Sequence, residues 1–342
     1  MRVLEVREPF GVDSLTFSTR ADPTPGPGQL LIQLKALSLN YRDQLVVGGI
    51  GRWRPKASRI PVSDGVGVVT AIGPSVTRFK IGDRVSPLFY PQWIDGPPAD
   101  EKMLMALGGA GLDGLYAEYG VVDESAAVAA PSHLNDEEAA TLPCAGLTAW
   151  NAVAEGGPPR EGETVVVLGT GGVALFAMQF AKLFGARVIV TSSSDSKLER
   201  ARALGAFGGI NYRTTPNWPD ALREMTGGRG ANLVVDSVGS LAESIAAVSV
   251  GGRIAFIGFV RGTTTEVDLI KLMGSSATIR AIDVGSRAMV EAMNRAIESS
   301  GLRPIVDRTF DFDDGLAAFH YLGSGAQFGK VCIRAPATRP TD

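Results

Sequence analysis

The fold is decided by the stretch Thr164-Val165-Val166-Val167-Leu168-Gly169-Thr170-Gly171-Gly172-Val173-Ala174. Its first half is a run of β-branched and apolar residues, which is typical of a strand buried on both faces of a parallel sheet. Glycines then interrupt the run, and residues 173–184 continue as an apolar helix that Gly185 closes. The stretch therefore predicts a strand, a tight turn and a helix rather than a membrane span.

The turn in this stretch has the features of a dinucleotide-binding loop. Gly169 permits a tight turn, Gly171 or Gly172 lets the backbone approach a pyrophosphate, and the small Ala174 lets the helix pack on the strand. Free N–H groups at the helix start would face the phosphates with the positive end of the helix dipole behind them. The alternative is an ordinary strand–helix turn that is rich in glycine. We assign cofactor binding to Gly169, Thr170, Gly171, Gly172 and Val173.

Strands and helices alternate on either side of this turn, from about residue 126 to residue 284, which predicts a doubly wound parallel α/β sheet. Residues 1–125 instead show short β-rich runs between Gly, Pro and Asp, so we expect an all-β lobe there. Residues 285–342 are expected to return to this lobe through a helix at 288–300 and a strand at 330–334. Within the parallel sheet we expect strands at 164–168, 187–191, 233–236, 253–257 and 278–282, and helices at 173–184, 196–204, 221–225 and 241–250.

Composition narrows the class of protein. A chain of 342 residues with 45% hydrophobic and 20% charged residues is an ordinary globular protein of about two domains. Its net charge of −3 is spread along the sequence, which gives no support to a nucleic-acid or membrane partner. The N-terminus alternates apolar and charged residues, unlike a signal peptide. Cys144 and Cys332 are the only cysteines, a usage typical of the reducing cytoplasm.

The second expected strand of the sheet indicates which nicotinamide cofactor binds. An NAD-selective enzyme usually holds the ribose hydroxyls with Asp or Glu at the end of this strand. Here the strand ends with Val190-Thr191-Ser192-Ser193-Ser194, and Asp195 is expected to cap the following helix. Hydroxyls and a lysine suit a 2′-phosphate, although they would also suit a capping serine cluster and a solvated lysine. We therefore predict NADP(H), held by Ser192, Ser193, Lys197, Tyr212 and Arg213.

Six motifs are spread along nearly the whole chain: Ser38-Leu39-Asn40-Tyr41-Arg42-Asp43, Pro61-Val62-Ser63-Asp64-Gly65-Val66-Gly67, Gly82-Asp83-Arg84-Val85, Cys144-Ala145-Gly146-Leu147-Thr148-Ala149-Trp150, the glycine turn and Asp236-Ser237-Val238-Gly239. Together they resemble the medium-chain dehydrogenase/reductase superfamily, in its quinone oxidoreductase and zeta-crystallin branch. The resemblance implies a GroES-like β domain joined to a Rossmann domain. It also implies cofactor contacts from Thr148, Ser237, Val238, Gly258, Phe259, Val284 and Lys330.

The sequence departs from the zinc alcohol dehydrogenases of this superfamily at the metal. Those enzymes have Cys where Asn40 stands and a His-Glu pair where Ser63-Asp64 stands. Cys144 matches a third ligand position, but one thiolate cannot replace the three protein ligands of a catalytic zinc. We therefore expect no metal.

Without a metal, the expected substrates are those that spread the new negative charge themselves. In a quinone, enone or 2-alkenal the hydride arrives at a conjugated position and the charge moves to an enolate or hydroquinone oxygen. Asn40, Tyr41 or backbone groups could hold that oxygen, and Tyr41 or water could supply the proton. These two residues are the catalytic candidates.

Two further expectations concern partners. The aromatic residues of the loop 89–98, among them Phe89, Tyr90 and Trp93, suit either the wall of a cleft for a hydrophobic or aromatic carbonyl substrate or a self-packed surface loop. The strand at 278–282 has the pattern of a covered edge, which indicates a homodimer. A zinc alcohol dehydrogenase with unusual ligands and a non-catalytic NADPH-binding protein remain as alternatives.

Overall fold

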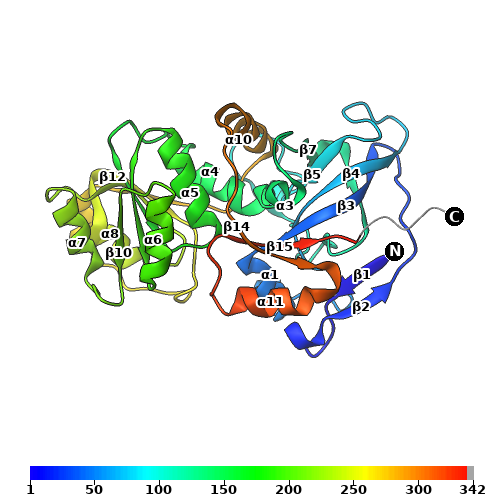
Figure 1. Cartoon of the computed structure of the whole chain (residues 1–342), viewed down its shortest axis with the longest axis horizontal. Coiled ribbons are helices and arrows are strands. Elements are labelled where there is room, and N and C mark those ends of the chain that lie inside the picture. The colour runs from blue at the N-terminus through cyan, green and yellow to red at the C-terminus, as the bar shows by residue number, and fades with distance from the viewer. Residues whose placement is uncertain (337–342) are drawn as a thin grey trace. The chain divides into compact units, whose positions relative to one another are not determined.

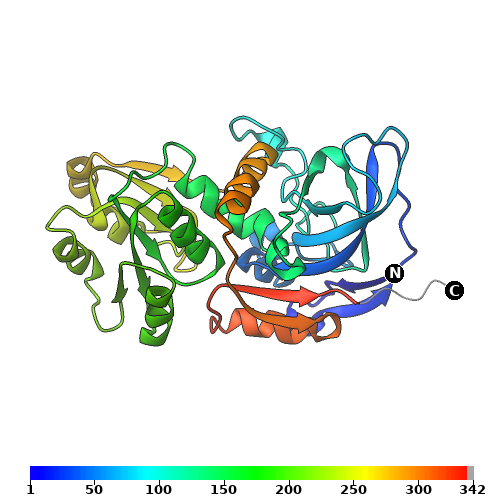
Figure 2. The same ribbon diagram turned by 45° about the horizontal axis from the view of Figure 1, so that its top comes forward.

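The computed structural model describes residues 1–336 of the chain. The chain forms two compact units. One, called here the β unit, contains Met1–Leu147 together with the chain from Gly285 onward, and the other, the α/β unit, is Thr148–Val284. Residues 126–147, which the sequence analysis grouped with the second domain, therefore lie in the β unit (Figures 1 and 2).

The α/β unit is the expected doubly wound sheet. Its strands are parallel and follow the order β10-β9-β8-β11-β12-β13, so the order reverses on the two sides of β8, and helices cover both faces (Figure 1). The strands are β8 (Thr164–Leu168), β9 (Arg187–Ser192), β10 (Gly208–Asn211), β11 (Ala231–Asp236), β12 (Val248–Phe256) and β13 (Thr278–Ala281). The helices are α4 (Leu147–Val153), which begins in the β unit, α5 (Gly172–Leu183), α6 (Asp195–Ala203), α7 (Trp218–Met225), α8 (Leu241–Ala247) and α9 (Leu269–Ser275).

The helix predicted over residues 241–250 is wrong in its last turn. α8 ends at Ala247, and β12 begins at Val248, which pairs with Ala231 of β11. The β-branched residues Val248 and Val250 favour the extended backbone once a partner strand is available. The periodicity of this segment alone carries no information about its partner, β11, which lies earlier in the chain.

Residues 164–181, which contain no charged side chain, do not form a single helix. They divide into β8 and the first part of α5, as the sequence predicts. Across the described residues 1–336, no helix is both long and apolar enough to cross a membrane.

The β unit is built on a mostly antiparallel sheet with the order β14-β15-β3-β4-β5-β7, in which β6 also pairs with β3. Its strands are β3 (Gln29–Leu39), β4 (Asp64–Ile72), β5 (Arg84–Pro87), β6 (Tyr119–Asp123), β7 (Ala127–Ala129), β14 (Val306–Asp311) and β15 (Lys330–Arg334), beside the separate pair β1 (Arg2–Glu5) and β2 (Thr16–Thr19). Its helices are α1 (Tyr41–Val47), α2 (Asp100–Met103), α3 (Asp136–Ala140), α10 (Arg287–Ser300) and α11 (Gly315–Gly323).

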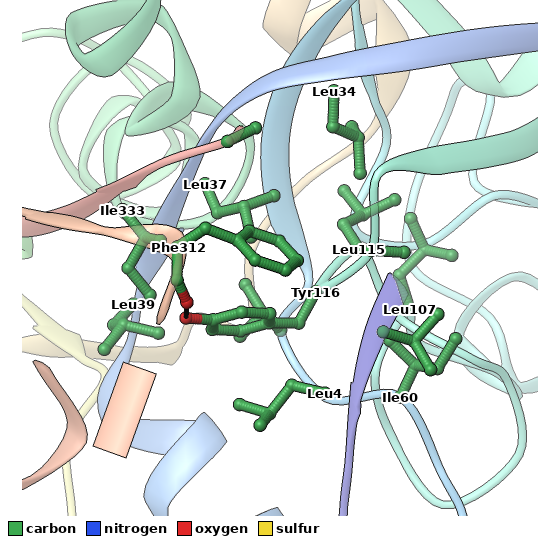
Figure 3. Packing of buried hydrophobic residues seen from close by; sticks show 14 of the residues in the cluster. Leu4, Leu34, Leu37, Leu39, Ile60, Leu107, Leu115, Tyr116, Phe312 and Ile333 are labelled. Carbon is green, nitrogen blue, oxygen red and sulfur yellow. Dashed lines mark hydrogen bonds between the residues drawn. The ribbon is translucent and has the colours of Figure 1, made fainter. Parts of the chain in front are cut away.

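The core of the β unit joins the two ends of the chain. Tyr116 is fully buried, its ring packs against Phe312 with 5.0 Å between centroids, and its hydroxyl donates to the Phe312 carbonyl at 2.8 Å (Figure 3). Leu4 and Leu37 lie in the same cluster. Because the cluster combines residues from the first 130 positions with residues beyond 305, the C-terminal segment is part of this core rather than an appendage.

The last strand of the β unit lies beside β3. β15 pairs antiparallel with β3, and Val331 is opposite Leu39 (Figure 1). One step further along the same register brings Lys330 to Asn40, where β3 ends and α1 is about to begin. The return of the C-terminal segment, expected from the sequence, therefore places a C-terminal lysine beside a predicted catalytic residue.

Candidate active site

Asn40 occupies the junction between β3 and α1. It is the residue before the first helical turn, and its backbone N–H donates to Asp43 Oδ2 at 2.8 Å. Asn40 is only 8% exposed, whereas Tyr41, the first residue of α1, is 46% exposed. The two predicted catalytic residues are thus neighbours on one turn but differ sharply in their access to solvent.

Lys330 binds the side chain of Asn40. Its Nζ donates to Asn40 Oδ1 at 2.5 Å and to the Leu39 carbonyl at 2.6 Å, and the residue is only 3% exposed. The sequence analysis assigned Lys330 to the cofactor; the structure places its ammonium group against Asn40, inside the β unit. No local motif around Lys330 signals this contact, because it depends on the β15–β3 register.

Two buried carboxylates lie near this lysine. Asp64, at the start of β4, accepts from the Ser63 hydroxyl at 3.0 Å and from the Cys144 N–H at 3.2 Å. Burial raises the pKa of Asp64 to about 6, although the positive charge of Lys330 and the nearby Asn40 amide act in the opposite direction. Burial also raises the pKa of Asp43 and is opposed by Arg42 and Lys330. We call Asn40, Asp43, Asp64 and Lys330 the polar cluster.

Cys144 lies next to the polar cluster in the helical turn Leu142–Gly146. Burial, reinforced by the negative charge of Asp64, raises the pKa of its thiol well above the ordinary value. Among the described residues, no group of three or more His, Cys, Asp or Glu side chains is arranged to hold a metal ion.

The aromatic loop of the β unit packs on itself. Phe89, Tyr90 and Trp93 are each less than 9% exposed, and the rings of Phe89 and Tyr90 meet edge to face with 4.7 Å between centroids. The Trp93 carbonyl accepts from the N–H of Arg287 at the start of α10. These contacts favour the self-packed alternative, so the loop gives no support to a hydrophobic substrate.

The glycine turn of the α/β unit joins β8 to α5 as predicted. Gly169 has φ +94°, a conformation that side chains rarely adopt. The residue before α5 is Gly171, so no side chain caps the helix, and its first N–H groups remain available to an anion. Space around Gly171 is open, since an added Cβ would meet no atom within 4 Å. These features suit a pyrophosphate.

The ends of the other parallel strands bring more of the predicted cofactor residues to the same edge of the sheet. Because all strands are parallel, their carboxyl ends lie together. The Ser237 hydroxyl donates to the Leu168 carbonyl at 2.6 Å, which ties the loop after β11 to the glycine turn. The residues at this edge are Ser192 (the last residue of β9), Ser193 (after β9), Tyr212 (after β10), Ser237 and Val238 (after β11), Gly258 and Phe259 (after β12) and Val284 (after β13). Thr148 is the first residue of the α/β unit, in α4.

The residues chosen for a 2′-phosphate surround the start of α6. Ser194, rather than Asp195, is the cap of this helix: its hydroxyl accepts from the Lys197 N–H at 3.4 Å. The expected capping role of Asp195 is therefore wrong, and its carboxylate instead accepts from the Asn211 amide at 2.8 Å. Ser192 Oγ accepts from the Ser194 N–H, while Tyr212 is 40% exposed.

Two residues that position this edge were missed by the sequence analysis. Asp236, fully buried at the end of β11, accepts from the N–H groups of residues 238, 239 and 240 and from the Ser244 hydroxyl. Asn151 donates to the Val284 carbonyl at 2.6 Å, and Val284 has φ +58°, which is unfavourable for a β-branched residue. Asp236 was visible in the quoted motif as an acidic residue at a strand end. No sequence signal identifies Asn151.

Comparisons with known proteins agree with this geometry. A family model described as alcohol dehydrogenase GroES-like domain matches residues 26–132, and one described as zinc-binding dehydrogenase matches residues 172–299. The chain belongs to the medium-chain dehydrogenase/reductase superfamily, whose GroES-like domain and Rossmann-type NAD(P)-binding domain correspond to the β unit and the α/β unit. The resemblance seen in the sequence is confirmed, and the chain is an oxidoreductase of this superfamily.

Individual relatives cover almost the whole chain. A zinc-type alcohol dehydrogenase-like protein of Schizosaccharomyces pombe is 42% identical over 90% of this chain and 91% of its own length. A 2-methylene-furan-3-one reductase of Solanum lycopersicum is 31% identical over 92% of this chain and 74% of its own.

Similar solved structures include an enzyme named as NAD-dependent and a protein complexed with NADPH. An NAD-dependent alcohol dehydrogenase matches with a TM-score of 0.89 and 33% identity, covering 98% of this chain and 100% of the other. A mycobacterial protein complexed with NADPH matches with a TM-score of 0.79 and 26% identity, covering 98% and 99%.

The buried carboxylate of Asp64 predicts a pH-dependent stability. Its pKa rises from an ordinary 3.8 to about 6 on folding, so the folded state binds more protons than the unfolded state between these values. The stabilising contribution is therefore complete below about pH 4 and is lost as the pH rises through about 6. In Asp64→Asn the amide oxygen can accept from Cys144 N–H and the amide nitrogen can donate to the Ser63 hydroxyl. We expect the free energy of unfolding of the wild type, relative to Asp64→Asn, to fall by on the order of 3 kcal/mol from pH 4 to pH 7.

Urea unfolding at several pH values measures this difference. Asp100→Asn, at an exposed position in α2, serves as the control and should show no such trend. A constant difference between the wild type and Asp64→Asn would show that Asp64 does not change its pKa on folding.

The hydrogen bonds that the buried Asp236 accepts predict that its substitution destabilises the protein. Asp236→Asn replaces one accepting oxygen by a donor that faces the N–H of Ser240 or of Val238, so the free energy of unfolding should fall by about 2–3 kcal/mol. Ser244→Ala removes only one of the hydrogen bonds and should cost about 1 kcal/mol. Urea unfolding would rank the two variants, and equal costs would argue against a shared role for the four bonds.

Proposed function

We propose that this protein is an NADPH-dependent reductase of conjugated carbonyl compounds, either quinones or enones and 2-alkenals, that works without zinc. The observation that carries the proposal is the polar cluster. In the β unit, where zinc relatives have a Cys and a His-Glu pair, this chain has the amide of Asn40 and the buried carboxylate of Asp64, and Lys330 donates a hydrogen bond to that amide. Such a set donates hydrogen bonds and holds charge, which is what a developing enolate needs.

A catalytic zinc does not fit these residues. Its protein ligands must be free to donate electron pairs, and a cysteine ligand must lose its proton. Asn40 Oδ1 is occupied by the Lys330 ammonium group, both Asp64 oxygens accept protein hydrogen bonds, and the pKa of Cys144 is raised. In the polar cluster the positive charge comes from the Lys330 ammonium group, whereas in zinc relatives it comes from the metal ion.

The nicotinamide supplies a hydride when NADPH is bound. The residues of the chain stabilise the product of this transfer. The amide of Asn40 donates to the oxygen that gains the negative charge, and Tyr41 or water supplies a proton. Tyr41 is exposed enough to exchange that proton with solvent. Conjugated acceptors suit this set because their charge spreads over several atoms and does not require a metal ion. The relative named 2-methylene-furan-3-one reductase supports the enone class.

The preference for NADPH is supported by the end of β9. Ser192 and Ser193 offer hydroxyls there, and Asp195, the next carboxylate along the chain, is bound to Asn211. Lys197 and Arg213 add positive charge. Both an NADPH complex and an NAD-dependent enzyme occur among the similar structures, so the serines and these cations carry the argument rather than the relatives.

We also propose that the protein forms a homodimer through β13. This strand is an edge of the parallel sheet, all four of its residues are exposed, and Ile279 is one of them. Beside it Leu269, Ile270 and Met273 of α9 are 67–83% exposed. An uncovered edge flanked by apolar side chains favours a second copy of the same strand related by a two-fold axis.

The reductase proposal predicts turnover confined to conjugated acceptors. Purified protein treated with a chelator should oxidise NADPH with a quinone and with a 2-alkenal, but not with the saturated aldehyde of the same chain length. NADH run in parallel should be poorer by about 10-fold or more in kcat/KM, as the loss of a charge-assisted contact to the 2′-phosphate implies. Activity on saturated aldehydes that the chelator abolishes would identify a zinc enzyme. Tight NADPH binding without any turnover would identify a binding protein.

The dimer proposal predicts that charge on α9 separates the subunits. Ile270→Glu combined with Met273→Glu places carboxylates in the proposed apolar contact and should halve the mass found by light scattering. Leu104→Glu changes a similarly exposed apolar side chain, 71% accessible, in the β unit, and should leave the dimer intact. A wild-type protein that is monomeric at micromolar concentration would refute the contact.

A further inference from the structure

Val284 adopts a backbone conformation that valine rarely takes. Its φ of +58° lies in the left-handed region, where a β-branched side chain is strained. The residue is only 4% exposed, which excludes a frayed surface loop. Strained residues persist only where the surrounding structure holds them, and they cluster at active sites and ligand-binding sites. The conformation of Val284 therefore points to a function of the segment around it.

The glycine that follows Val284 does not account for this strain. Gly285 has no positive φ, and a Cβ added to it would lie 3.0 Å from side-chain carbons of Leu147 and from Met289 Sδ. Gly285 thus makes room for packing, while the left-handed position is occupied by a valine. A turn that served only to end β13 would avoid the strain with glycine at position 284.

Asn151 of α4 holds Val284 in place. Its Nδ2 donates to the Val284 carbonyl at 2.6 Å, and the residue is only 4% exposed. The main chain of Asn151 is fixed in turn, because Arg280 of β13 donates from Nη2 to the Asn151 carbonyl at 2.5 Å. The segment that ends β13 is therefore bound to α4 at two points, Arg280 and Val284.

Val284 lies at the edge of the parallel sheet that suits a dinucleotide. The N–H of Ile282 donates to the Phe256 carbonyl at 2.9 Å, so the ladder between β12 and β13 continues to residue 282. The left-handed turn follows directly, at the carboxyl edge where the glycine turn after β8 also lies. Dinucleotides bind across this edge in doubly wound sheets, so the course of the main chain at Val284 bears on cofactor binding.

We propose that Asn151 is a positioning residue for the cofactor: its hydrogen bond keeps Val284 in the left-handed conformation, which tight binding of NADPH requires. Without this bond Val284 relaxes toward the extended region, and only a fraction of the molecules keeps the binding-competent edge. The apparent Kd then rises by the inverse of that fraction. The inference rests on the cofactor in the proposed function and is independent of the acceptor that is reduced.

Calorimetric titration with NADPH tests this role without any turnover. In Asn151→Ala the Kd should rise about 10-fold, which corresponds to about 1.4 kcal/mol and lies within the cost of one strained residue. Glycine adopts positive φ readily, so Val284→Gly should remove the need for Asn151. The Kd of the double variant should stay within about 3-fold of that of Val284→Gly alone. A purely structural role of Asn151 would not depend on the residue at position 284.

Asn294→Ala is a matched control. Asn294 of α10 is 8% exposed and donates from Nδ2 to the Ala129 carbonyl at 3.0 Å, so the change removes another buried amide–carbonyl bond, here in the β unit. Urea unfolding should show a similar loss of stability in Asn294→Ala and Asn151→Ala, whereas Asn294→Ala should leave the Kd for NADPH unchanged. An equal rise of the Kd in both variants would overturn the proposal, because it would reflect a general loosening of the protein.

Two other outcomes would also overturn the proposal: an unchanged Kd in Asn151→Ala, or a rise of the same size with valine and with glycine at position 284. If Asn151→Ala does not fold, Asn151→Ser, whose hydroxyl can bond to a carbonyl within α4, is measured in the same two backgrounds.

Failure of the proposed function is distinguishable from failure of this inference. A wild type that binds NADPH but reduces no conjugated carbonyl refutes the reductase and leaves the titrations as they are. A wild type that binds NADH in place of NADPH refutes the cofactor preference, and the same ratios are then measured with NADH. A wild type that binds neither cofactor would overturn the inference.

Discussion

The antiparallel pairing of β15 with β3 is the constraint on which the β unit depends. It inserts a strand from the end of the chain beside one from its beginning, and its register sets Lys330 against Asn40. The same return packs the ring of Phe312 against the ring of Tyr116 and brings the Phe312 carbonyl to the Tyr116 hydroxyl (Figure 3). Packing and polar chemistry in this unit thus follow from one strand pairing.

The α/β unit obeys a different constraint. Parallel strands place their carboxyl ends at one edge, so residues far apart in the sequence converge without any contact between their side chains being required. The loops that follow the strands at this edge must also be held in a fixed conformation. Asp236 contributes to this by accepting three backbone N–H groups and one hydroxyl, and Asn151 holds the strained Val284.

The sequence predicted the parts of the fold that depend on local signals. The run from Thr164 to Ala174 identified β8, the turn and α5, and the alternation that follows identified the parallel sheet. Interactions between strands that are far apart in the sequence could not be predicted from these local signals. The start of β12 at Val248 needed its partner in β11, and the contact of Lys330 with Asn40 needed the β15–β3 register. The aromatic loop illustrates the same limit, because residue types alone could not tell a cleft wall from rings that pack on each other.

The division of the chain into units also bears on the order of folding during synthesis. The α/β unit is continuous in sequence, so the ribosome completes it before the last strands of the β unit exist. The β unit must hold β3 with an open side until β15 emerges. During that interval, main-chain groups of β3 and apolar residues such as Tyr116, which Phe312 later covers, are exposed to other chains. Synthesis therefore leaves the half of the protein that carries the polar cluster dependent on protection against aggregation, while the other half is already folded.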